Sequence, residues 1–97
     1  MQFFVRWEIF ETIKDENELV TVRQVFGEQV RHIFDSGKVV ASGCFTDGRS
    51  GFFMLDVDSS EDLLQLLGSA ILDHCRLETH PVVSYQTLAE LFLDQQV

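Results

Sequence analysis

The order in which two hydrophobic periodicities alternate along the chain is the feature that most limits its fold. Runs rich in aromatic and branched residues at 2–10, 38–46, 51–57 and 75–83 predict strands. Apolar residues spaced three and four apart over 16–36 predict a helix after the first strand. A second such stripe, after the sequence DSSED, predicts another helix before the last strand. The order is therefore strand, helix, strand, strand, helix, strand.

Local signals place the ends of these elements. Gly37 stops the first helix. The Asp-Gly pair in DGRS accepts the positive φ of a tight hairpin turn between the second and third strands. Ser59 or Ser60 caps the second helix. The sequence SYQTLAELFLDQQ (84–96) predicts a short C-terminal helix capped by Ser84. Its apolar face is formed by Leu88, Leu91 and Phe92.

Two residues are unusual for the elements that hold them. Gly27 lies inside the first helix, where glycine costs about 1 kcal/mol relative to alanine. A close approach of this helix to the sheet would explain it. Pro81 lies near the end of the last strand, where an edge position tolerates the missing N–H donor.

This order of elements predicts an α+β fold of the ferredoxin-like, split βαβ type. With a central hairpin and right-handed crossovers, the strands form an antiparallel four-stranded sheet in the order 4-1-3-2. Both helices then cover one face, and the short C-terminal helix follows the last strand. The 97 residues are expected to form a single domain, 1–97.

The first and last strands, which are neighbours in this sheet, each carry a basic and an acidic residue two positions apart. In an antiparallel pair of strands, the residue numbers of opposed residues add up to a constant. Arg6 with Glu78 and Glu8 with Arg76 both sum to 84. One register therefore places two opposite-charge pairs on a single sheet face, as a cross-strand ladder worth a few tenths to about 1 kcal/mol per pair.

The same face carries apolar side chains such as Phe52 and Met54 and lies opposite the helices. A sheet face this apolar is rarely left in water. We therefore expect two copies of the chain to pack face to face as a dimeric α+β barrel. The charged residues would then lie in an interior cavity or at its mouth.

The sequence FFMLDVDSSEDLLQLL, followed by a strand ending near a proline, resembles the second half of muconolactone isomerases and related small dimeric α+β barrel proteins. MQFFVRWEI resembles their first strand, and several uncharacterised families look similar. The most specific part, LDVDSSEDL (55–63), joins a strand end to a helix cap and is a signature of the fold. The resemblance implies a homodimer that acts as a cofactor-free isomerase-like enzyme or binds small aromatic-derived or lactone-like compounds. SAILDHC replaces the stretch that precedes the last strand in those isomerases, so no catalytic residue is carried over.

The charged strand residues also suggest chemistry by proton transfer. A carboxylate in an enclosed cavity can have its pKa raised towards neutrality and then act as an acid or base. The acid/base candidates are Glu8, Glu78 and His80. The ligand-binding candidates are Arg6 and Arg76, for an anionic group, and Trp7 and Met54, for an apolar or aromatic one.

A structural role for the same residues is the alternative. If Glu8 and Glu78 pair with the two arginines, they stay ionised, and the ladder only sets the register of a non-catalytic dimer. Trp7 and the Phe cluster would then belong to the core or to the dimer interface.

Composition excludes several classes of function. The net charge is −9, with sixteen acidic against seven basic residues, which disfavours nucleic acid and anionic membranes as partners. No apolar run reaches the ~20 residues that span a bilayer. Cys44 and Cys75 are expected to be buried free thiols in a reducing cytosol, so a cytoplasmic location is expected, with no signal peptide. No phosphate loop, nucleophile elbow or metal-ligand spacing occurs, and we expect neither a cofactor nor a metal.

Overall fold

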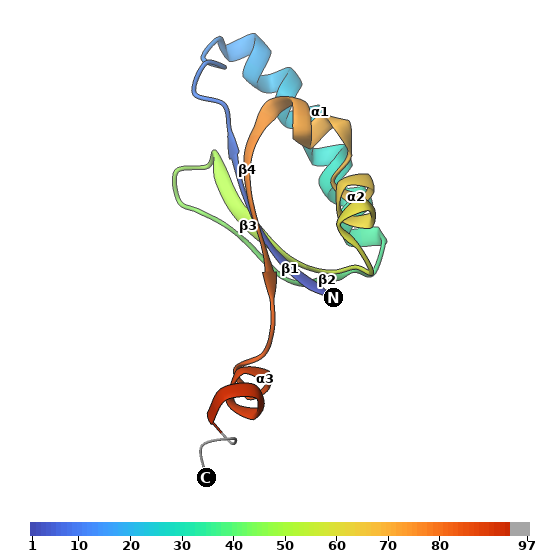
Figure 1. The fold of residues 1–97 in the computed structure, drawn as a ribbon. Coiled ribbons are helices and arrows are strands. Elements are labelled where there is room, and N and C mark those ends of the chain that lie inside the picture. Colours follow the sequence, from blue (N-terminus) through green and yellow to red (C-terminus); the bar gives the residue numbers. More distant parts are fainter. Residues whose placement is uncertain (94–97) are drawn as a thin grey trace.

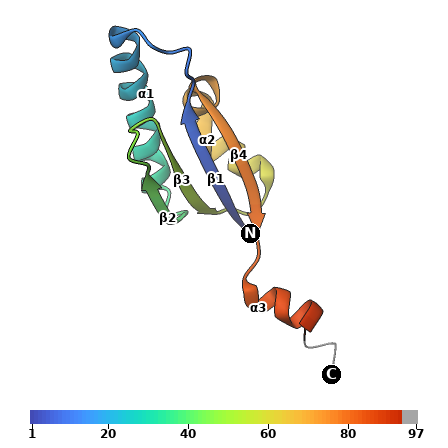
Figure 2. The same ribbon diagram turned by 90° about the vertical axis from the view of Figure 1, so that its left-hand side faces the viewer.

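The computed structural model describes residues 1–93 and has the predicted α+β, ferredoxin-like topology. Four strands form one antiparallel sheet in the order β2-β3-β1-β4, and α1 and α2 cover one of its faces (Figures 1 and 2). Residues 94–96, which the sequence also assigns to the C-terminal helix, lie outside the described part. The elements are β1 (Gln2–Ile9), α1 (Glu16–Asp35), β2 (Val39–Cys44), β3 (Ser50–Asp56), α2 (Ser60–His74), β4 (Cys75–Val82), α3 (Tyr85–Leu88) and a π-helical segment, η1 (Ala89–Leu93).

The core lies between the sheet and the two long helices. Along β1, every second side chain is buried under the helices, as the twofold periodicity of a strand requires. Full burial of a large apolar side chain contributes about 1.5–3 kcal/mol, so this layer provides most of the stability. The sheet contributes Phe3, Val5, Trp7, Ile9, Phe53, Leu55 and Cys75, and the helices contribute Val22, Ile33, Leu63, Leu67 and Ile71.

The predicted turn and cap signals are confirmed. Gly37 and Gly48 have positive φ angles of 73° and 72°, the conformation that glycine adopts without strain. Ser59 caps α2, because its side-chain oxygen accepts a hydrogen bond from the backbone N–H of Asp62. Pro81 lies on β4, an edge strand of the sheet, as predicted. None of the helices in residues 1–93 is long and apolar enough to cross a membrane.

The second helix is not continuous, contrary to the sequence expectation. Gly68 has φ 75° and ψ 165°, so α2 breaks there. The side-chain amide of Gln29 on α1 donates a 2.9 Å hydrogen bond to the carbonyl oxygen of Leu66 at this break. A Cβ atom at position 68 would lie only 2.6 Å from that amide nitrogen. The break therefore lets one polar side chain of α1 reach the backbone of α2.

The prediction that Gly27 allows a close approach of α1 to the sheet is wrong. A Cβ atom there would meet nothing within 4 Å, and the residue is exposed. The close approach occurs at Gly51 on β3, which is opposed to Trp7 in the β1–β3 register. A Cβ atom at Gly51 would lie 2.7 Å from Cζ2 of Trp7 and would also collide with the carbonyl oxygen of Gly43. The indole ring therefore occupies the space that a side chain at position 51 would need.

The prediction of two buried thiols is confirmed for one cysteine and wrong for the other. Both cysteines are free, but Cys44 is exposed and Cys75 is buried. Cys44 is the last residue of β2, an edge strand, whereas Cys75 begins β4 beneath the helices. Burial raises the pKa of the Cys75 thiol to about 11.

The two glycines give a matched pair of substitutions. Gly51→Ala should lower the free energy of unfolding by about 1–3 kcal/mol, because the new methyl group collides with backbone and the Trp7 ring. Gly27→Ala should raise it by about 1 kcal/mol, because the position is open and helical. Urea unfolding of both variants measures these changes. A Gly51→Ala variant as stable as the parent chain would contradict the described packing of Trp7.

Candidate functional site

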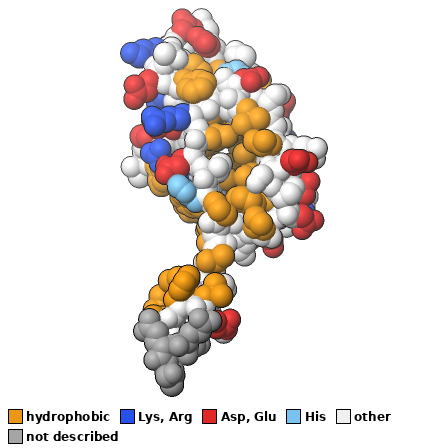
Figure 3. Space-filling view, viewed as in Figure 1, with side chains coloured by type: hydrophobic (Ala, Val, Ile, Leu, Met, Phe, Trp, Pro, Cys, Tyr) orange, Lys and Arg blue, Asp and Glu red, His pale blue; other side chains and the backbone are white. Residues whose placement is uncertain are grey.

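The face of the sheet turned away from α1 and α2, here called the open face, divides into two strips. In Figure 3, basic, acidic and histidine side chains gather along the side opposite the helices. The register places Phe4 opposite Met54 and Arg6 opposite Phe52, so these residues share the open face. The apolar strip consists of Phe4, Phe45, Phe52 and Met54. The charged strip consists of Arg6, Glu8, Arg76, Glu78 and His80.

The three phenylalanine rings of the apolar strip form a continuous row. The Phe4 and Phe52 rings stack at 5.8 Å between centroids, and the Phe45 ring lies 6.3 Å from that of Phe52. Phe45 is 40% exposed, while Phe4, Phe52 and Met54 are half-buried. These side chains therefore cover one another only in part, and within residues 1–93 nothing packs over them to bury them fully.

The predicted register of the first and last strands is confirmed. Arg6 is opposed to Glu78 and Glu8 to Arg76 in the antiparallel pairing of β1 with β4. The cross-strand ion pairs themselves are not formed among residues 1–93. The strand register fixes the backbone positions of two opposed residues. The contacts of each long side chain with its other neighbours determine where its charged group lies.

Each glutamate instead contacts a side chain of its own strand. Nη1 of Arg6 lies 3.4 Å from Oε2 of Glu8, and the guanidinium carbon lies 5.6 Å from the centre of the Phe45 ring. A cation over an aromatic face is attracted by the ring electrons, so Arg6 leans towards the apolar strip and away from Glu78. On β4, Nε2 of His80 lies 2.9 Å from Oε1 of Glu78.

The His80 contact sets the protonation of Glu78. The hydrogen bond from His80 is the main reason that the pKa of Glu78 lies below its ordinary value of 4.5, with smaller contributions from the positive charges of His80, Arg6 and Arg76. Glu78 is therefore ionised at neutral pH. Its geometry suits a carboxylate that orients an imidazole base more than one that donates a proton.

Glu8 and Arg76 face a hollow at the end of the charged strip. It has a volume of about 250 Å³ and is lined by Ile9, Phe10 and Glu11 besides these two residues. Arg76 is exposed and forms no ion pair with any residue of the described chain. The hollow therefore presents the guanidinium of Arg76 together with the carboxylates of Glu8 and Glu11 beside the Phe10 ring.

Arg49 shapes this hollow and was not predicted. Its guanidinium donates hydrogen bonds to the carbonyl oxygens of Phe10, at 2.7 Å, and Ile13, at 3.1 Å. These bonds tie the loop after β1 to the β2–β3 hairpin and hold the Phe10 wall in place. Asp47 orients the same hairpin by accepting hydrogen bonds from the backbone of Arg49 and the hydroxyl of Ser50. The sequence marks DGRS only as a turn, with nothing to show that its arginine reaches another loop.

Trp7 does not join the other candidates. It is buried on the helix-covered side of the sheet, with its ring centroid 4.7 Å from that of Phe26. It lines a separate apolar pocket of about 100 Å³ together with residues of α1, β2 and β3. The indole N–H is buried there and has no hydrogen-bond acceptor among residues 1–93. The other six candidates all lie on the open face.

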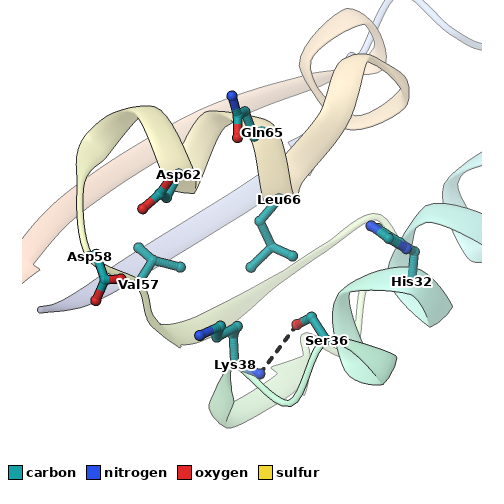
Figure 4. A pocket seen from close by; sticks show the side chains of 8 residues that line it. All are labelled: His32, Ser36, Lys38, Val57, Asp58, Asp62, Gln65 and Leu66. Atoms are coloured by element: carbon teal, nitrogen blue, oxygen red, sulfur yellow. Dashed lines mark hydrogen bonds between the residues drawn. The ribbon is translucent and has the colours of Figure 1, made fainter.

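A larger hollow, of about 270 Å³, lies between the end of α1 and the start of α2 (Figure 4). His32 and Lys38 face Asp58 and Asp62 across it, so its charges are mixed. The Ser36 hydroxyl accepts a hydrogen bond from the backbone of Lys38 at 3.2 Å. The open face combines a guanidinium without an ion pair in the described part of the chain, an imidazole–carboxylate pair and aromatic rings, and we regard it as the better candidate site.

Comparison of the sequence with known protein families finds no match, and comparison with curated proteins finds none either. The ferredoxin-like topology is therefore what places this chain among known architectures. Within residues 1–93, no three His, Cys, Asp or Glu side chains are grouped so that they could hold a metal ion.

Replacing His80 tests the electrostatics of the strip. His80→Gln should raise the pKa of Glu78 towards 4.5, because the strongest stabilisation of the carboxylate is removed. A depressed folded-state pKa stabilises the fold above the ordinary pKa and ceases to do so as pH falls through the lowered value. The parent chain should therefore be more stable than the variant near pH 6, and the difference should vanish at strongly acid pH.

Carbon-13 NMR titration of the Glu78 carboxyl group measures this pKa directly. Arg76→Gln is the control and should shift it less, since the charge of Arg76 is the smallest of the contributions. An unchanged Glu78 pKa in His80→Gln would show that the 2.9 Å contact does not persist in solution.

Proposed function

We propose that the protein is a homodimer, formed through its open face, that binds a small anionic, aromatic-derived or lactone-like molecule and moves a proton on it without a cofactor. The resemblance of LDVDSSEDL and MQFFVRWEI to muconolactone isomerase-like barrels supports the barrel architecture, and the His80–Glu78 pair supports chemistry by proton transfer. The observation that carries the proposal is the hollow at the charged strip, where Arg76 has no ion-pair partner among residues 1–93.

The charge of the open face supports association of two copies. The chain carries −9 overall, but the charged strip holds two arginines, two glutamates and one histidine. The four permanent charges cancel, so two strips can meet without the repulsion that other parts of an acidic surface would cause. A twofold axis would also let a cation of one copy face an anion of the other.

The proposed chemistry assigns a role to each group. Arg76 binds the anionic group of the ligand, and the aromatic rings of the apolar strip contact its flat face. His80, oriented by the ionised Glu78, removes a proton from the carbon next to the lactone carbonyl and returns it to the far end of the resulting dienolate. The arginines balance the negative charge that develops on the oxygen.

A non-catalytic dimer is the second candidate, and one observation favours it. Both glutamates already have a partner on their own strand, because Glu8 pairs with Arg6 and Glu78 is hydrogen-bonded to His80. Such pairs need no ligand. In that case Glu78→Gln should change the stability of the dimer, whereas in an enzyme it should lower turnover and leave the dimer intact.

Light scattering over a dilution series gives the first test. A mass near twice 11.1 kDa is expected. The dimer is then titrated with salicylate, as an anionic aromatic probe, and assayed with α-angelica lactone, whose double bond moves into conjugation by proton transfer and changes its ultraviolet absorbance. Arg76→Gln should weaken salicylate binding at least about tenfold, the loss expected for one charged hydrogen-bonding group.

Arg23→Gln is the matched control, because it removes the same charge from an exposed position on α1. It should leave salicylate binding unchanged. Equal losses in the two variants would reduce the effect to net charge and contradict a site at Arg76. A persistent monomer would rule out the barrel. A dimer that neither binds salicylate nor isomerises the lactone would favour the non-catalytic candidate.

A further inference from the structure

Residues 83–93, here called the C-terminal arm, stand apart from the rest of the molecule. The arm leaves the end of β4 and projects beyond the sheet (Figures 1 and 2). The chain measures 61 Å in its longest direction, and its radius of gyration is 16.1 Å, against about 13 Å for a compact chain of 100 residues. No residue of α3 or η1 is buried, and none belongs to the hydrophobic core.

The arm exposes an apolar face that a solvated segment would not have. On the side that Figure 3 shows, hydrophobic side chains gather where the arm joins the body. Leu88, Leu91 and Phe92 are three and four positions apart, whereas the side chains of Gln86 and Glu90 meet through a 3.3 Å hydrogen bond. The exposed apolar residues are Val83, Tyr85, Leu88, Leu91, Phe92 and Leu93, with exposed fractions between 43% and 74%.

The sequence nevertheless specifies a helix here. Ser84 is the N-cap, and its hydroxyl oxygen accepts a 3.1 Å hydrogen bond from the backbone N–H of Thr87. Two turns of helix are too short to be stable in water without packing, since isolated helices of fewer than about 12 residues are marginal. A capped, apolar and unpacked helix therefore requires a surface that the arm's own chain does not supply.

The second copy of this chain supplies such a surface. A stable interface buries about 800 Å² of accessible surface on each partner. The arm adds to what the open face can bury, because each exposed aromatic side chain can bury up to about 150–250 Å².

The position of the arm also fits exchange between copies. The last pair of β4 joins Val82 to Gln2, at the end of the open face where the apolar strip begins. A second copy packed on that face would place its own sheet and helices beside the projecting arm. His80 lies just before this point and is 58% exposed in the single chain. An arm packed against the partner there would shield the His80–Glu78 pair from water.

We propose that the C-terminal arm is exchanged in the dimer, with the apolar face of each arm packed against the other copy at the end of the open face. This inference rests on the dimer proposed above. By symmetry, both arms make the same contact, as in other exchanged dimers. The arm thereby closes one end of the space between the two sheets.

Two charge substitutions on opposite faces of the arm give the test. Leu88→Asp places a charge on the apolar face and should raise the dimer dissociation constant at least about 100-fold, as for a buried anchor of an interface. Gln86→Asp adds the same charge on the polar face and should change it less than about threefold. Analytical ultracentrifugation measures both, and circular dichroism checks that each variant is folded.

A crosslinking experiment asks directly whether the arm crosses between copies. Phe92 is replaced by the photoreactive amino acid benzoylphenylalanine, and nitrogen-15-labelled and unlabelled chains are mixed, equilibrated and irradiated. Mass spectrometry should find arm–body peptide pairs that combine one labelled and one unlabelled partner. Pairs that are all of one isotope would overturn the exchange.

The outcomes separate the two proposals. If the parent chain is a monomer at every concentration, the dimer and the exchanged arm both fail. If the parent chain is a dimer and Leu88→Asp dimerises as tightly as Gln86→Asp, the arm fails and the open-face dimer stands. Weakened association in Leu88→Asp together with mixed-isotope crosslinks supports the exchange.

Discussion

The structure depends on the position of β1 between β3 and β4. Every second side chain of this strand is driven into the core beneath α1 and α2, which fixes its register against both neighbours. A slip of one residue would expose Phe3, Val5 and Ile9 and bury Arg6 and Glu8. The hydrophobic layer therefore determines which residues meet on the opposite face. The charged strip follows from the core and does not hold the sheet in register.

This dependence explains which features of the structure could be predicted from the sequence. Alternation and turn signals predicted the topology, and the constant sum of residue numbers predicted the opposition of Arg6 to Glu78, because strand pairing follows backbone rules with few solutions. The contacts of those side chains were not predictable in the same way. Arg6 has several partners within reach, and the ring of Phe45, brought in by a third strand, attracts it away from Glu78.

The other features that the sequence did not predict have similar causes. The break at Gly68 depends on a glutamine that is distant in sequence, and the role of Arg49 depends on a loop that only the folded sheet brings near. Trp7 was grouped with the ligand-binding candidates by residue type, although its parity on β1 is that of the core residues. Parity along a central strand was the more reliable guide than aromatic character.

The open face and the C-terminal arm present one physical problem in two places. The open face leaves Phe45 exposed and its other apolar side chains half-buried, and the arm, which projects beyond the end of β4, exposes six apolar side chains. The proposed second copy would cover both at once and would enclose Arg76 and the His80–Glu78 pair in a space of lower dielectric constant. Charges act more strongly in such a space, which is what a proton-transfer site requires.

Hydroxyl-radical footprinting of the two methionines tests the covering of the open face most directly. Met54 lies in the apolar strip, and Met1, which is 64% exposed, serves as an internal control in the same molecule. If a second copy covers the open face, oxidation of Met54 should be slow at high protein concentration and should rise on dilution, while that of Met1 stays constant. Oxidation of Met54 at the same rate at every concentration would show that the face is free in solution.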